Sequence, residues 1–257
     1  MGPTSWRHGL ATFVCVLLSA CASTPQPPVE ALPLTGPLQG WSLRPLPGKA
    51  QTRYVLSSRE GRACVQATSE GSASLLRRML DLPSGQIARI EFDWWIDAGP
   101  VVPSGEQPPD DAAARIVLGF EGDEARLSVK DRLMFELART ITGESPPYAS
   151  LIYAWDARQV HDVTLISERS DRLRKIVVAG GEQPPGRWLH LSRDLGADFR
   201  QAYGEVPGRL VGLALMTDSD NTSSHAQACY GDVRFYDAQG QLLQGSLLMS
   251  APALSAP

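Results

Sequence analysis

Hydrophobic and polar residues alternate along several stretches of the chain, a pattern typical of strands with one buried face. In residues 87–97, Ile90, Phe92, Trp94 and Ile96 share one face, and charged residues alternate with them. Residues 113–121 repeat this pattern. Eight more segments are expected to be strands: residues 63–68, 73–80, 149–155, 163–167, 173–179, 188–192, 209–217 and 227–236.

Two segments have a different period. Leu133, Met134, Leu137, Ala138 and Ile141 recur at helical spacing in residues 130–141, and Gly143 supplies a stop signal. A second short helix is expected at residues 198–203, before Gly204. Strands and helices do not alternate along the chain, which argues against a doubly wound parallel sheet. The pattern predicts an all-β fold with two short helices, an antiparallel β-sandwich of jelly-roll type.

The N-terminus has the form of an export signal, with Arg7 and His8 before the apolar residues 10–18 and small residues after them. Leu18-Ser19-Ala20-Cys21 resembles the lipobox of bacterial lipoproteins. The resemblance implies that Cys21 carries the lipid, and Ala22 resembles the outer-membrane sorting pattern. The expected organisation is a signal peptide (1–20), a lipidated cysteine with a Pro-rich tether (21–40), one domain (41–244) and a flexible tail (245–257).

The predicted export and the net charge restrict the state of the cysteines and the class of ligand. Cys15 leaves with the signal and Cys21 takes the lipid, so Cys64 and Cys229 remain; in an exported protein we expect them to pair, with two separate buried thiols as the alternative. The net charge is −4 and the sequence pI is about 5.6, so no basic field is available to bind nucleic acid.

Two groups of acidic residues follow or precede predicted strands. Asp110 and Asp111 stand before one strand, and Asp218, Asp220 and Asn221, the chain's single asparagine, follow another. Oxygen-bearing side chains of this kind suit calcium or sugar hydroxyls, and Asp218, Asp220 and Asn221 are the candidate calcium ligands. The alternative is that both groups are ordinary polar turns.

Another carboxylate pair lies within a strand. Glu91-x-Asp93 resembles the E-x-D-x-x-E strand of sandwich-fold glucanases, but Ile96 stands where the acid/base would be. Hydrolysis at this strand is therefore not expected. Trp95 lies on the charged face of the same strand and is a candidate stacking surface for a ligand, or packs beneath a loop or helix. Trp155 ends another strand and is also a candidate stacking surface, or packs in the core or at its rim.

Five segments resemble a bacterial exported family known only as a domain of unknown function: residues 110–115, 153–155, 198–200 with 203–205, 214–222 and 230–233. The stretch from Ala214 to Thr222 is the most specific. The resemblance covers most of residues 41–237 and implies a single exported domain, with no activity attached.

Three functions remain open. The first is a non-catalytic binding module, anchored by its lipid to the bacterial envelope at the outer membrane facing the periplasm, with a glycan as ligand and calcium as a candidate ion. The second is a polysaccharide hydrolase that uses the loop carboxylates, which would have to converge in one cleft. The third is a structural lipoprotein that binds another protein.

Overall fold

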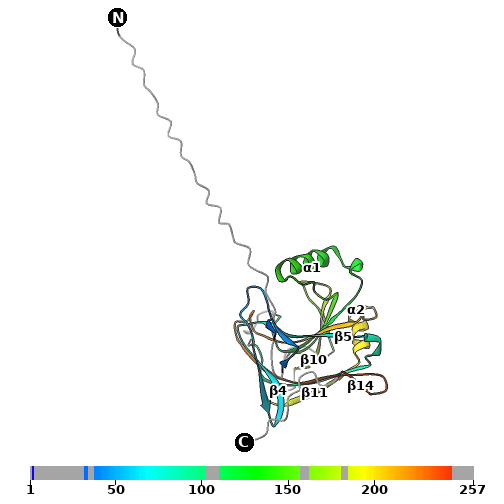
Figure 1. The fold of residues 1–257 in the computed structure, drawn as a ribbon. Coiled ribbons are helices and arrows are strands. Elements are labelled where there is room, and N and C mark those ends of the chain that lie inside the picture. Colours follow the sequence, from blue (N-terminus) through cyan, green and yellow to red (C-terminus); the bar gives the residue numbers. More distant parts are fainter. Residues whose placement is uncertain are drawn as a thin grey trace.

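In the computed structural model, the chain folds into two stacked β-sheets (Figure 1). The structure describes residues 38–101, 110–156, 162–180 and 185–244, besides residue 2 and the backbone at residues 32–33. The predicted lipobox, most of the tether and the whole of the tail lie outside these residues. No helix in the described part of the chain is long and apolar enough to cross a membrane.

The larger sheet has eight strands and the smaller has six. In spatial order the larger sheet contains β1 (Leu32–Pro33), β2 (Trp41–Pro45), β5 (Ser74–Leu82), β12 (Leu210–Asp218), β7 (Ala112–Phe120), β8 (Ala149–Asp156), β10 (Leu173–Gly180) and β9 (Thr164–Ile166). The smaller sheet contains β11 (Trp188–Arg193), β6 (Arg89–Ala98), β13 (His225–Tyr236), β4 (Arg62–Glu70) and β3 (Arg53–Arg59), with β14 (Leu242–Gln244) paired to β13. The predicted β-sandwich with two α-helices is confirmed, although β8 and β10 pair in parallel.

The core lies between the sheets and follows the alternation in the sequence. On β6, Ile90, Phe92, Trp94 and Ile96 are all fully or almost fully buried. Phe92 stacks on Tyr153 of β8, with ring centroids 5.6 Å apart. These contacts between the sheets fix which face of β6 points outward.

Both predicted helices form where the capping residues favour them. In α1 (Val129–Thr142), the Ser128 side chain accepts a hydrogen bond from the backbone amide of Asp131, and Gly143 ends the helix in the left-handed region at φ 74°. In α2 (Leu195–Tyr203), the Asp194 side chain caps the first turn and Gly204 ends the helix in the left-handed region. Single 3₁₀ turns lie at η2 (Ser84–Gln86) and η3 (Glu124–Arg126).

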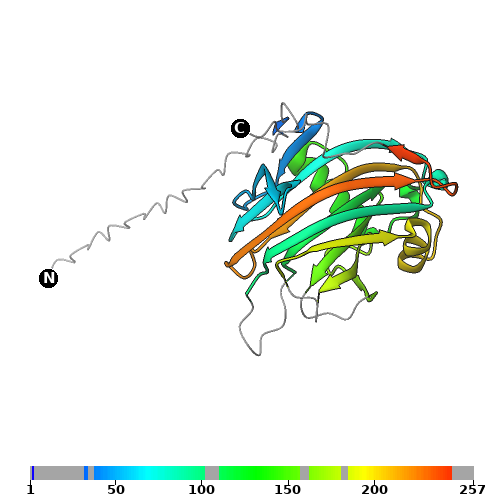
Figure 2. The ribbon, with the colours of Figure 1, turned by 90° about the horizontal axis from the view of Figure 1, so that it is seen from below.

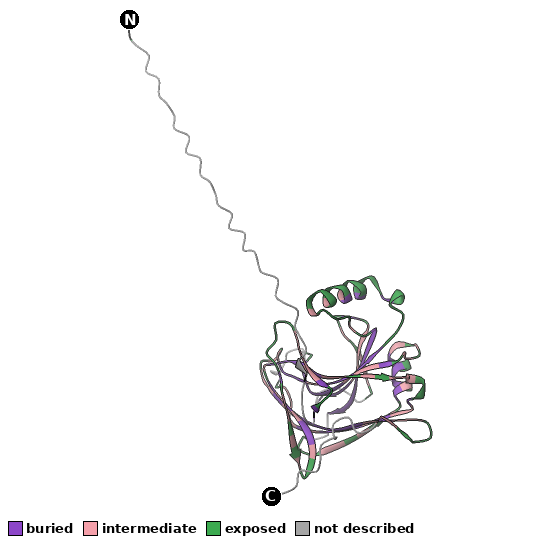
Figure 3. Cartoon of the chain, viewed as in Figure 1, coloured by how far each residue is buried: buried purple, intermediate pink, exposed green. Residues whose placement is uncertain are grey.

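The two helices are buried to different extents (Figure 3). Phe199 of α2 packs against Phe120 at 4.7 Å between ring centroids, so α2 belongs to the core. In α1 only Asp131 and Phe135 are buried. The aliphatic residues that predicted this helix are therefore largely outside the core.

Cys64 on β4 and Cys229 on β13 form the expected disulfide, with Cα atoms 5.6 Å apart. The bridge links neighbouring antiparallel strands although the two cysteines are 165 residues apart in sequence. β2 and β3 were not predicted from the sequence. β2 has only five residues, and β3 is an edge strand in which no residue is fully buried.

Candidate functional site

The two acidic groups that the sequence singles out come together at one edge of the larger sheet. Asp110 and Asp111 precede β7, and Asp218 ends β12, which pairs with β7 in the register Asp218↔Ala112. Because the strands run antiparallel, the start of one meets the end of the other. One carboxylate oxygen from each of Asp111, Asp218 and Asp220 lies within 4.8 Å of the other two.

Asp111 holds the turn that follows β12. Its carboxylate accepts hydrogen bonds from the backbone amide of Asn221 at 3.3 Å and from Asn221 Nδ2 at 2.8 Å. It also accepts bonds from the amide and hydroxyl of Thr222 at 2.8 and 2.7 Å. The only asparagine of the chain therefore donates to Asp111 through its amide nitrogen.

The other three carboxylates are paired with cations. Arg115 on β7 reaches Asp218 at 2.9 Å and Asp110 at 3.0 Å, and both Arg115 and Asp218 are buried. Asp218 also accepts the amide of Ala112 at 3.1 Å. Lys175 on β10 lies 3.2 Å from Asp110, and Lys49 forms an ion pair with Asp220.

Burial sets the electrostatics of this cluster. Loss of solvent raises the pKa of Asp218 to about 7, and the neighbouring Asp111 and Asp110 charges add to the rise, against the opposing effect of Arg115. Burial also acts to raise the pKa of Asp110, but Arg115 and Lys175 outweigh it and hold that pKa below its ordinary value. The carboxylates around Arg115 raise its pKa in spite of burial.

In these contacts the carboxylates bind other parts of the protein rather than a ligand. A calcium ion here would have to displace Lys49 from Asp220, and it would compete with Arg115 and with four donors to Asp111. A glycosidase needs a carboxyl group that reaches the substrate, and the Asp218 side chain is only 3% exposed. The carboxylates converge, but their hydrogen bonds and ion pairs suit neither calcium binding nor glycoside hydrolysis.

The raised pKa of Asp218 predicts a pH dependence of stability. A folded-state pKa near 7 against 3.8 in the unfolded chain means that the folded protein keeps a proton which the unfolded protein has already released. This stabilising contribution is complete below about pH 4 and is lost as the pH rises through 7.

Urea unfolding between about pH 5 and pH 8 measures the effect. The free energy of unfolding should fall with pH by up to about 1.4 kcal/mol per unit more steeply in the wild type than in Asp218→Asn. The exposed Asp81→Asn is the control and should keep the wild-type slope. Equal slopes in wild type and Asp218→Asn would contradict the prediction.

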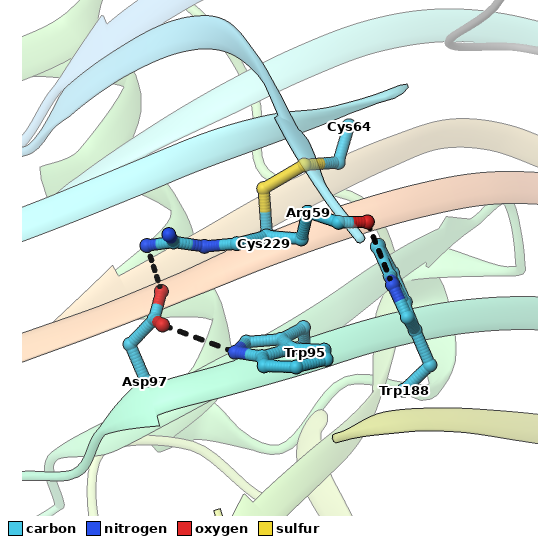
Figure 4. Close-up of a disulfide and its surroundings, with 6 residues drawn as sticks. All are labelled: Arg59, Cys64, Trp95, Asp97, Trp188 and Cys229. Carbon is cyan, nitrogen blue, oxygen red and sulfur yellow. Dashed lines mark hydrogen bonds and ion pairs between the residues drawn. A yellow bond between two sulfur atoms is a disulfide. The ribbon is translucent and has the colours of Figure 1, made fainter. Parts of the chain in front are cut away.

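A second group of side chains lies on the outer face of the smaller sheet (Figure 4). Trp95 of β6 is half-buried there, and its partner across the strands is Trp188 of β11. The two indole rings meet edge to face at 6.1 Å between centroids. Trp95 donates from Nε1 to Asp97 at 3.0 Å, and Trp188 donates to the carbonyl oxygen of Arg59 at 3.1 Å.

Charged side chains surround this pair. The Arg62 guanidinium lies 4.2 Å from the centroid of the Trp188 ring and 3.2 Å from Asp93. Asp93 is also 3.1 Å from His190, whose side chain is 54% exposed. We call Arg59, Arg62, Asp93, Trp95, Asp97, Trp188 and His190 the tryptophan surface.

The structure separates the two tryptophans that the sequence proposed as ligand platforms. Trp155 is 5% exposed and belongs to the core between the sheets, so it is not an available stacking surface. Trp95 faces outward, as its place on the charged face of β6 indicated. Sequence reasoning gave no ligand role to Trp188, Arg62 or His190. The alternation along residues 188–192 was visible, but not the register that places Trp188 and His190 opposite Trp95 and Asp93, nor the approach of Arg62 to Trp188.

Solved structures with a distant likeness to this chain include carbohydrate-active enzymes. Two of them are the endoglucanase Cel12A from Rhodothermus marinus (9% identity, 77% of this chain, 92% of that chain, TM-score 0.40) and the family 11 xylanase from Neocallimastix patriciarum (12%, 81%, 95%, TM-score 0.37). A third is the xyloglucanase domain of NopAA from Sinorhizobium fredii in complex with cellobiose (9%, 77%, 94%, TM-score 0.38). Scores of this size carry no argument about activity.

Sequence comparison is more specific. No functionally curated protein matches the chain. Residues 39–234 match the family described as "Protein of unknown function (DUF3047)", which spans nearly all of the two sheets. The resemblance seen in the sequence is confirmed, and the chain belongs to the DUF3047 family.

Proposed function

We propose that this protein is a non-catalytic glycan-binding module held at the bacterial cell envelope, and that the tryptophan surface is its binding face. The observation that carries the proposal is the pair Trp95 and Trp188 on an open sheet face, ringed by hydrogen-bonding side chains. Figure 2 shows the strands of the smaller sheet with no helix over them.

The chemistry of this face suits a sugar. An indole ring offers a flat apolar surface for the C–H face of a pyranose. Arg62 and His190, with side chains 48% and 54% exposed, stand beside the rings and can reach sugar hydroxyls. Both acceptors and donors are therefore present around an apolar centre, as ligand sites require.

The face is also held rigid before any ligand arrives. Both indole N–H groups are engaged in hydrogen bonds, and Trp95, Cys229 and Trp188 lie in one row across three strands. The disulfide made by Cys229 is itself buried, with Cys64 2% and Cys229 0% exposed. Fixed side chains lose little entropy on binding, which favours affinity.

The envelope location rests on the sequence. Leu18-Ser19-Ala20-Cys21 and the Pro-rich residues that follow support a lipid on Cys21 and a semi-extended tether to the domain. Ala22 supports the outer membrane as the destination, with the domain in the periplasm. A glycan of the envelope would then be within reach of the tryptophan surface.

A hydrolytic function receives less support. The carboxylates proposed for it, Asp110, Asp111, Asp218 and Asp220, are each engaged by internal donors or cations. On the tryptophan surface, Asp93 and Asp97 are likewise paired with Arg62 and Arg59. The described residues thus offer no free pair of carboxylates on this face.

Retention on insoluble polysaccharides, a glycan array and calorimetry test the proposal. Wild type should bind at least one glycan, and Trp95→Ala should weaken that binding about tenfold or more, as expected for the loss of one stacking contact. Leu56→Ala, which removes an exposed side chain from β3 of the same sheet, is the control and should bind as wild type.

Calcium or EDTA should leave the affinity unchanged, because the acidic cluster is held by internal partners. A wild-type protein that binds no glycan, or a Trp95→Ala variant that binds as well as wild type, would refute the glycan-binding proposal. Thermal unfolding of each variant shows whether a loss of binding is a loss of fold.

A further inference from the structure

Helix α1 carries an apolar stripe that faces solvent. Val129, Leu133, Leu137 and Ile141 follow one another at intervals of four residues, and they are 67, 67, 54 and 40% exposed. Residues four apart lie on one side of a helix, so the four side chains form a continuous row. A solvent-facing row of four large aliphatic side chains is costly in water unless something covers it.

The row does not belong to the core. The buried residues of α1 are Asp131 and Phe135, which point to another side of the helix. Asp131 accepts hydrogen bonds from the hydroxyls of Ser128 and Ser170 at 2.8 and 2.6 Å, which fixes the rotation of the helix. The stripe is therefore held outward by buried polar contacts.

Cations dominate the exposed polar positions of the helix. Lys130, Arg132 and Arg139 are exposed basic residues, against the single exposed acid Glu136, which pairs with Arg139 at 3.1 Å. An apolar stripe bordered by basic residues is the pattern of helices that lie in the interface of a membrane and attract anionic lipids. This charge favours a lipid surface over an uncharged apolar partner.

The length of α1 fits the same orientation. Fourteen residues make a helix of about 21 Å, which is shorter than the hydrocarbon core of a bilayer. Such a helix can lie along a membrane surface but not cross it.

The position of α1 in the fold agrees with a membrane on its side. Figure 1 shows α1 beyond the larger sheet, on the side away from β4 and β11 of the smaller sheet. Glu144, just after α1, pairs with Arg44 of β2, the strand that directly follows the predicted tether. The end of α1 therefore lies close to the strand where the chain would arrive from a lipid anchor.

We propose that α1 docks flat on a bilayer containing anionic phospholipid, with Val129, Leu133, Leu137 and Ile141 inserted among the upper acyl chains. The domain would then present the tryptophan surface away from that bilayer, because the two features lie on opposite sides of the sandwich. This contact is separate from glycan binding and from the lipid on Cys21.

Vesicle co-sedimentation of the full chain carrying Cys21→Ser, which removes the predicted lipid site, tests the proposal. The protein should sediment with vesicles of phosphatidylglycerol and phosphatidylethanolamine, and much less with phosphatidylcholine alone. Leu133→Gln/Leu137→Gln should lower the partition coefficient at least about tenfold, because two leucine side chains no longer gain from burial.

Leu56→Gln/Leu242→Gln is the matched control, since it alters two aliphatic residues of similar exposure in the smaller sheet, and it should partition as wild type. Lys130→Glu/Arg132→Glu should weaken binding to the anionic vesicles in particular. Because all four side chains changed in α1 are exposed, thermal unfolding should show little change.

Absence of vesicle binding, or a stripe variant that partitions as wild type, would overturn the proposal. Light scattering tests the main alternative, in which a second copy of the chain covers the stripe. A dimer that Leu133→Gln/Leu137→Gln dissociates, with no vesicle binding, would mean that a second copy of the chain covers the stripe. Neither result would affect the glycan test on Trp95.

Discussion

Replacing Arg115 with leucine should lower the free energy of unfolding by about 3–5 kcal/mol, the usual cost of breaking a buried ion pair. Arg115 is buried and joins Asp218 to Asp110 across the start of β7. Without the guanidinium, Asp218 keeps the amide of Ala112 as a donor but has no cation to offset its charge. Urea unfolding near pH 8, above the folded-state pKa of about 7 at which Asp218 ionises in the wild type, measures the loss.

A double-mutant cycle separates the ion pair from the packing of the arginine. Arg115→Leu/Asp218→Leu should cost less than the sum of the two single changes, because the double variant leaves neither charge buried alone. Arg209→Leu breaks an exposed pair with Asp81 and should cost no more than about 1 kcal/mol. Additive effects at Arg115 and Asp218 would show that the pair does not act as a unit.

Replacing both disulfide cysteines with alanine is expected to destabilise the domain by up to about 5 kcal/mol. The bridge closes a loop with a sequence separation of 165 residues, and the chain-entropy relation gives this value as the restriction it places on the unfolded chain. Thermal and urea unfolding of Cys64→Ala/Cys229→Ala measure the effect. The native strands β4 and β13 pair along their length, so the fold itself should persist.

The reductant dithiothreitol provides an independent check on the same bridge. It should lower the melting temperature of the wild type towards that of the double variant and leave the double variant unchanged. If the proposed glycan surface is correct, the folded double variant should also bind glycan more weakly, because Cys229 is the cross-strand neighbour of Trp95. A melting temperature that changes neither with dithiothreitol nor with Cys64→Ala/Cys229→Ala would contradict the stabilising role of the disulfide.

Much of the fold follows from patterns local in sequence. The alternation in β6 and β7 determines which side chains enter the core, because a strand with one buried face must repeat every second residue. Ser128 and Gly143 bound α1 in the same local way, through a capped first turn and a left-handed last residue. The sheet-rich sandwich and both helices were therefore predictable.

Local patterns also failed in identifiable places. β3 lies at the edge of its sheet and buries no side chain completely, so its sequence lacks a strong alternation. The spacing of Leu133 and Leu137 indicated a helix but not which side of it meets the domain. That was decided by Asp131 and Phe135, whose partners come from distant segments.

The candidate sites likewise combine features that the sequence determines with features that depend on the tertiary structure. The sequence by itself determined that Asp110, Asp111, Asp218 and Asn221 occupy the ends of strands, that Trp95 shares a face with charged residues, and that two cysteines remain to pair. Only the tertiary structure decided that Lys49, Arg115 and Thr222 satisfy the carboxylates, that Trp155 is buried and that Trp188 lies beside Trp95. The reason is physical: periodicity records which face of a strand avoids water, whereas the partners of a charge or a ring depend on strand register between segments up to about 165 residues apart.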